Sequence, residues 1–189
     1  MSGIELDYLY GSPLFREWGR SRRLEVEGRV RLGFIGCGNH ATTMLFPCLP
    51  MIPEVELVAT CDLVEERARR NCRRFGGLRW YTDYRKMIEE EQLDAVAVVG
   101  PPEMHTELGV ACLEAGLHVF MEKPPSVDLE GIKHLCEAAK RTGKYGMVAT
   151  MWRHAQAHKI AKKIIGSPEF GRPVLFLSLI HISEPTRPY

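Results

Sequence analysis

The sequence lacks the features that mark membrane, secreted and nucleic-acid-binding proteins. No apolar run approaches the roughly 20 residues that a membrane-spanning helix needs, and the first residues have neither the basic start nor the apolar core of a signal peptide. The formal net charge is only +1, which gives no electrostatic argument for binding nucleic acid or acidic membranes. We therefore expect a cytoplasmic protein without a nucleic-acid or membrane partner.

Paired cysteines are also missing. The six cysteines, at positions 37, 48, 61, 72, 112 and 136, contain no Cys-x-x-Cys pair, so neither a zinc site nor a disulfide framework is indicated. Most of them lie in apolar stretches, and we expect buried thiols in a reducing compartment. His154 and His158 have a spacing that suits a metal ion, but no third ligand is evident beside them, and we predict no metal site.

From residue 30 on, strand-like and helix-like segments alternate. Apolar residues are 45% of the chain and charged residues 26%, the composition of a soluble globular protein. Short apolar runs predict strands over residues 30–35, 55–61, 95–99, 117–121 and 145–150. This alternation predicts an α/β fold, a doubly wound parallel sheet of the Rossmann type with helices on both faces.

The segments between the strands have helical periodicity and their own start and stop signals. Apolar positions share one face over residues 64–75, 104–115 and from residue 129 on, and these helices are expected to stop at Gly76, Gly116 and Gly143. Asp128 is the expected N-cap of the last of them. Asp83 is expected to cap a shorter helix before the third predicted strand.

A glycine-rich turn follows the first predicted strand. Residues 36–41 match the dinucleotide-binding fingerprint, with Gly36 and Gly38 in the first two glycine positions and Ala41 in the third. The first glycine permits a tight turn, the second lets the backbone approach a pyrophosphate, and the small third residue lets helix and strand pack closely. The free N–H groups of the following helix are predicted to bind phosphate. Asn39 and His40 lie inside the turn, and His40 either lies near the pyrophosphate or nicotinamide or simply fills a turn position.

An acidic residue follows the second predicted strand. Asp62 lies about 20 residues after the glycine turn, where such a carboxylate accepts hydrogen bonds from the hydroxyls of the adenosine ribose. The same carboxylate repels a 2′-phosphate, so NAD is the expected cofactor and NADP is less favoured. Arg67 and Arg69 follow Asp62, and we expect them on a solvated helix face.

Two further pairs of residues are predicted at the same edge of the sheet. Glu122 and Lys123 directly follow the strand predicted over residues 117–121, and open α/β sheets bind their ligands at the carboxyl ends of strands. Lys123 is a general acid or base, a donor to a substrate hydroxyl and the nicotinamide ribose, or an ion-pair partner of Glu122; its place favours the first two. Pro101 either borders the cofactor or only ends the strand with a rigid turn. His105 is either a site residue or a capping or packing residue.

Together these residues resemble the Gfo/Idh/MocA oxidoreductases, a family that includes glucose–fructose oxidoreductase and inositol 2-dehydrogenase. The resemblance covers residues 30–176 and rests on the glycine turn, Asp62, the Pro-x-x-x-His and Glu-Lys-Pro segments, and Trp152-Arg153. It implies an NAD(P)-dependent dehydrogenase of sugars, cyclitols or related polyols, and a homo-oligomer formed through a second domain. The predicted catalytic residue is Lys123, and the predicted cofactor-binding residues are Gly36, Gly38, Asn39, His40, Ala41, Asp62, Pro101, His105, Glu122, Lys123 and Arg153.

The chain is expected to have four parts. Residues 1–29 are a surface extension or the product of a translation start placed too far upstream, residues 30–150 are the NAD(P)-binding Rossmann domain, and residues 151–176 begin an αβ substrate domain. Residues 177–187 match the translation of a transposase sequencing adapter, so we expect residues 177–189 to be artefactual and the rest of the substrate domain to be missing. Such a chain is predicted to bind NAD with little or no dehydrogenase activity; the alternative is a non-catalytic NAD(P)-binding module.

Overall fold

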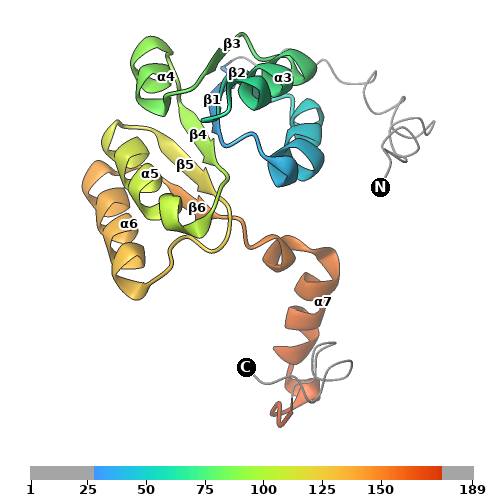
Figure 1. Cartoon of the computed structure of the whole chain (residues 1–189). Coiled ribbons are helices and arrows are strands. Elements are labelled where there is room, and N and C mark those ends of the chain that lie inside the picture. Colours follow the sequence, from blue (N-terminus) through green and yellow to red (C-terminus); the bar gives the residue numbers. More distant parts are fainter. Residues whose placement is uncertain (1–27, 176–189) are drawn as a thin grey trace, which may run out of the picture. The chain divides into compact units, whose positions relative to one another are not determined.

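The computed structural model describes residues 28–175, so the expected tail and most of the N-terminal extension lie outside the described residues. The chain divides into two compact units between Ala149 and Thr150, beside the boundary expected after residue 150. Within the described part of the first unit six strands form one sheet (Figure 1): β1 (Val30–Ile35), β2 (Val55–Cys61), β3 (Arg79–Tyr81), β4 (Ala95–Val98), β5 (His118–Met121) and β6 (Gly146–Val148).

The strand order is that of a doubly wound sheet. The strands lie in the order β3-β2-β1-β4-β5-β6, and each neighbouring pair is parallel. The chain therefore builds outward from β1 in one direction, returns, and builds outward in the other from β4. The predicted Rossmann fold is confirmed, and the carboxyl ends of β1 and β4 form the switch point at which such sheets bind ligands.

Helices cover both faces of the sheet, and the central strand β4 is buried on both sides. Along β4, Val96 and Val98 pack in one apolar cluster, whereas Ala97 and the following Val99 pack in the other. Because successive side chains of a strand point to opposite faces, this alternation requires cover on each side. The helices of this unit are α3 (Glu65–Phe75), α4 (Tyr84–Glu90), α5 (Pro102–Glu114) and α6 (Leu129–Thr142).

The predicted helix signals are present. The Asp83 side chain accepts a hydrogen bond from the Arg85 amide at 2.9 Å, and that of Asp128 accepts one from the Gly131 amide at 2.7 Å. Gly76 follows α3 and Gly143 follows α6, with φ values of 80° and 67° that favour glycine. Residues close in the sequence, the capping aspartates and the C-terminal glycines, therefore determine where these helices begin or end.

Four features differ from the sequence-based expectations. The edge strand β3 was not expected, because its three residues are short and largely exposed. Helix α5 begins at Pro102, two residues before the predicted start at residue 104. The helix after the glycine turn is irregular: a π-helical segment (Ala41–Leu45) continues into a 3-10 helix (Phe46–Met51) whose two prolines prevent regular α-helical bonding. The expectation of buried thiols holds for four of the six cysteines and fails at Cys48 and Cys136, which are exposed.

The described part of the second unit is short. It contains a 3-10 helix (Met151–His154), α7 (Gln156–Ile165) and a second 3-10 turn (Pro168–Phe170). Within it, the ring of Trp152 lies 5.4 Å from that of His158, centroid to centroid. Among the described residues of both units, no helix is both long and apolar enough to cross a membrane.

Candidate functional site

The glycine turn begins with a backbone contact that excludes any side chain. Gly36 has a φ of +94°, and a Cβ atom built on it would lie 1.7 Å from the carbonyl oxygen of Val99. Its N–H donates to the Cys61 carbonyl at 2.8 Å. Gly36 is thus wedged between the ends of β2 and β4, and only glycine fits there.

The second and third fingerprint positions have different surroundings. A Cβ atom on Gly38 would meet nothing within 4 Å, and its φ lies outside the left-handed region. The space in front of Gly38 is therefore open, as the approach of a pyrophosphate requires. Ala41 is fully buried and packs in the cluster that contains Phe34 and Phe46. The packing roles of Gly36 and Ala41 are present, and the phosphate contact of Gly38 stays a prediction that this open space suits.

Side chains from neighbouring elements anchor the turn. The Cys37 amide donates to Asp62 Oδ2 at 2.8 Å, and the Val64 amide donates to Asp62 Oδ1 at 2.8 Å. Asp62 is only half-buried, and each of its oxygens keeps a second lone pair for a ribose hydroxyl. Burial, reinforced by the Asp62 carboxylate, raises the pKa of the Cys37 thiol, so this thiol stays neutral and packs as an apolar side chain.

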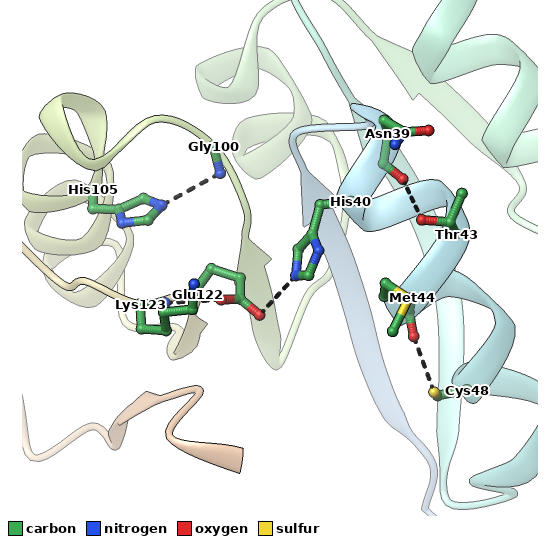
Figure 2. A network of polar contacts seen from close by, with 9 residues as sticks. All are labelled: Asn39, His40, Thr43, Met44, Cys48, Gly100, His105, Glu122 and Lys123. Carbon is green, nitrogen blue, oxygen red and sulfur yellow. Dashed lines mark hydrogen bonds and ion pairs between the residues drawn. The ribbon is translucent and has the colours of Figure 1, made fainter. Parts of the chain in front are cut away.

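The start of the following helix is held by hydroxyl groups. Thr42 Oγ1 donates to the Gly38 carbonyl at 2.8 Å, and Thr43 Oγ1 donates to the Asn39 carbonyl at 2.8 Å (Figure 2). The side chains of Asn39 and His40 are exposed. Both are therefore accessible from solvent, and their contacts with a cofactor stay predictions.

His40 links the glycine turn to the end of β5. Its Nε2 atom lies 3.2 Å from Glu122 Oε1, although the two residues are 82 positions apart in the sequence. Figure 2 shows the imidazole and the carboxylate pointing toward each other. The His40 side chain is 48% exposed and that of Glu122 only 6%, so Glu122 is a buried carboxylate whose partner stands at the surface.

Lys123 is held by its neighbours through the backbone. Its amide donates to Glu122 Oε2 at 3.0 Å, while its side chain is exposed. The ion pair between Glu122 and Lys123 that the sequence allowed is not among the salt bridges of the described residues, because the Glu122 carboxylate faces His40 instead. The Lys123 ammonium is therefore free to reach a ligand at this edge of the sheet.

His105 holds the other side of the same segment. It is fully buried; its Nδ1 atom lies 2.6 Å from the Pro124 carbonyl oxygen, and its Nε2 atom accepts from the Gly100 amide at 3.3 Å. This arrangement places the proton on Nδ1. His105 thus joins the β4–α5 loop, which includes the exposed Pro101, to the carbonyl of Pro124, the residue after Lys123. The geometry favours the packing alternative, in which His105 positions the loops and does not itself touch a ligand.

The remaining predicted residues lie elsewhere. Arg153 belongs to the second unit, so its cofactor contact stays a prediction. Arg67 is exposed on α3, and Arg69 forms an ion pair with Glu66, which agrees with a solvated helix face. The described residues include no group of three or more metal-ligating side chains that could hold an ion. One buried polar residue near the turn, Asn71, was not predicted from the sequence.

Comparisons with known proteins agree with this geometry. Residues 30–150 match the Gfo/Idh/MocA family, described as an oxidoreductase family with an NAD-binding Rossmann fold. The scyllo-inositol 2-dehydrogenase (NAD(+)) of Bacillus subtilis is 31% identical over 154 residues, which are 82% of this chain and 43% of that protein.

Two solved structures illustrate the likeness of fold. A dehydrogenase from Chromobacterium violaceum has a TM-score of 0.73 and 31% identity, over 77% of this chain and 43% of its own. A variant of KijD10, a 3-ketoreductase from Actinomadura kijaniata in complex with TDP-benzene and NADP, has a TM-score of 0.69 and 31% identity, over 73% and 42%. The chain thus spans less than half the length of these relatives. Since the family match covers more than half of this chain, the protein belongs to the Gfo/Idh/MocA oxidoreductases, and residues 30–150 are its NAD-binding Rossmann domain.

Proposed function

We propose that this chain is the nucleotide-binding part of a dehydrogenase that moves a hydride between NAD and a sugar, cyclitol or related polyol. One observation carries the proposal: the glycine turn, open in front of Gly38, is joined by the 3.2 Å contact of His40 with Glu122 to the segment that presents Lys123. A phosphate-binding turn and an exposed cation therefore share one edge of the sheet, the usual place of ligands in open α/β folds.

The residues present suit the cofactor. The Gly38 backbone and the following helix N-terminus offer N–H groups for the pyrophosphate. The half-buried Asp62 offers carboxylate oxygens for the adenosine ribose and would repel a 2′-phosphate, which supports NAD over NADP. When bound, the nicotinamide supplies the hydride chemistry, and the protein supplies position and charge.

Lys123 is the proposed catalytic residue. We infer that its ammonium donates to the substrate hydroxyl and the nicotinamide ribose, because its exposed side chain is not paired with Glu122 while its own amide and the carbonyl of the next residue, Pro124, are anchored. Further acid or base groups, the substrate pocket and the contacts of a homo-oligomer are proposed to belong to a second domain. A reducing cytoplasm is the proposed compartment, because all six cysteines are free.

The cofactor proposal is tested by calorimetric titration of the 189-residue chain with NADH and NADPH. We expect binding of NADH and weaker binding of NADPH. Asp62→Ala should reduce or remove the preference, because the carboxylate that repels the 2′-phosphate is gone. Tighter binding of NADPH by the unchanged chain would contradict the assigned role of Asp62.

The catalytic proposal needs the uninterrupted protein, assayed with a panel of polyols. Lys123→Ala should lower turnover strongly and leave NADH affinity near normal, whereas the 189-residue chain should show little or no turnover. Unchanged turnover in Lys123→Ala would favour the alternative, a non-catalytic NAD(P)-binding module.

A further inference from the structure

Helix α3 contains a buried polar residue that the fold itself does not explain. Asn71 is completely buried, on the helix face that also buries Ala68 and Cys72. Apolar or small residues usually fill such positions. We propose that Asn71 is a positioning residue that orients the peptide between Cys37 and Gly38 for phosphate binding; this inference rests on the proposed binding of NAD.

The contacts of Asn71 fix its orientation. Its Nδ2 group donates to the Cys37 carbonyl at 3.3 Å and to the Arg67 carbonyl at 2.9 Å. Since both neighbours are acceptors, the amide nitrogen must face them. The oxygen Oδ1 is then buried without a hydrogen-bond partner among the described residues. An unpaired buried oxygen is unfavourable, so folding stability does not account for an asparagine here.

The bond to Cys37 has a consequence on the opposite side of the peptide. Thr42 Oγ1 also lies 3.3 Å from the Cys37 carbonyl oxygen, but its single proton points to the nearer Gly38 carbonyl at 2.8 Å, so Asn71 is the chief donor that holds the Cys37 carbonyl toward the protein. In a trans peptide the C=O and the next N–H point in opposite directions. Only the bond between Lys123 and Pro124 is cis among the described residues, so the Gly38 N–H points away from Asn71.

The Gly38 N–H is available for a ligand. It donates no hydrogen bond within the described residues, and the space in front of Gly38 is open. The Cys37 N–H, by contrast, is already used by Asp62. Without Asn71 the Cys37 carbonyl would keep only the longer contact with the Thr42 hydroxyl, and the peptide could rotate more freely. Asn71 thereby acts on the cofactor through the backbone, with no contact of its own.

The test replaces Asn71 by leucine, which has nearly the same shape and no polar atoms. We expect Asn71→Leu to unfold close to the temperature of the original chain, because removal of the unpaired oxygen offsets the loss of the two amide hydrogen bonds. NADH affinity, measured by fluorescence titration, should nevertheless fall about fivefold to tenfold, the size of one lost hydrogen bond. This combination separates positioning from a structural role, which would lower stability and affinity together.

A matched control lies next to Asn71 on the same buried face. Cys72→Ala removes buried volume from α3 and should lower the unfolding temperature without changing NADH affinity. A second variant, Asn71→Ala, should show the same loss of affinity as Asn71→Leu. Unchanged affinity in both Asn71 variants would overturn the proposal, and so would failure of both to fold, since Asn71 would then be needed by the fold.

An amide measurement distinguishes this inference from the proposed function. In NMR spectra recorded without NADH, the resonance of the Gly38 amide should shift in Asn71→Leu relative to the original chain, because the orientation of its peptide changes. If the original chain does not bind NADH, the proposed function fails, yet this amide change still reports whether Asn71 orients the peptide. An unchanged Gly38 amide would refute the inference independently.

Discussion

Gly36 and Gly38 stand two positions apart, and the same substitution should affect them in opposite ways. An alanine at position 36 would place Cβ 1.7 Å from the Val99 carbonyl oxygen at a φ of +94°. The backbone conformation alone costs an L-residue about 1–2 kcal/mol, and overpacking against a rigid backbone atom adds about 1–3 kcal/mol. Gly36→Ala should therefore lower the free energy of unfolding by about 2–5 kcal/mol, a large share of the about 5–15 kcal/mol typical of a domain.

Gly38→Ala is the matched counterpart. A Cβ atom there meets nothing within 4 Å, so the free energy of unfolding should stay the same or rise by up to about 1 kcal/mol, because alanine restricts the unfolded chain. The methyl group would occupy the space proposed for the pyrophosphate. Loss of one or more charge-assisted hydrogen bonds, each about 1.5–3 kcal/mol, should weaken NADH binding about tenfold to a hundredfold.

Urea unfolding and NADH titration of the two variants measure both quantities. Gly36→Ala should fail chiefly in stability and Gly38→Ala chiefly in binding. If Gly38→Ala bound NADH as tightly as the original chain, the phosphate would not lie against Gly38, and the assignment of the site would be wrong. If Gly36→Ala unfolded at the original urea concentration, the close approach to Val99 would be refuted.

Three further predictions follow from burial and hydrogen bonding. In the native chain only Cys48 and Cys136 should react quickly with a thiol reagent, and all six cysteines should react in denaturant; rapid reaction of more than two native thiols would contradict the described burial. Burial raises the pKa of the Cys61 thiol from its usual value near 9 to about 12, so its contribution to stability is present below about pH 9 and lost as the pH rises toward 12. The free energy of unfolding should therefore decrease from about pH 8 to about pH 11 in both chains, and the decrease should be about 2 kcal/mol smaller in Cys61→Ala than in the original chain. Equal decreases would argue against the raised pKa of Cys61. His105→Ala leaves two backbone groups without their partner and should lower the free energy of unfolding by about 2–4 kcal/mol in urea; a change below about 0.5 kcal/mol would show that these bonds contribute little.

The elements that local chemistry determines were predictable from the sequence. β1 and β2 have the predicted bounds, since each is an apolar run ended by a turn or an acidic residue. The caps at Asp83 and Asp128 are short-range hydrogen bonds, which a single sequence reveals. The glycine fingerprint was informative for the same reason, because the residue type at each of its positions is determined by local steric requirements.

Contacts between distant segments were not predictable. The pairing of His40 with Glu122 depends on the strand order, which brings the ends of β1 and β5 to one edge of the sheet. β3 has no apolar alternation of its own and forms because β2 offers it an edge. Asn71 did carry a signal, a polar residue on an otherwise buried helix face, but only the structure shows which carbonyl it meets.

The strand order has a mechanical consequence. The glycine turn belongs to the half of the sheet that grows outward from β1, and the Lys123 segment belongs to the half that grows outward from β4; β1 and β4 meet along a single seam. A dinucleotide lying across that seam would contact both halves of the sheet and would hold them together. Its binding energy would oppose their separation. Addition of NADH should therefore slow amide exchange more along β1 and β4 than along the outer strands.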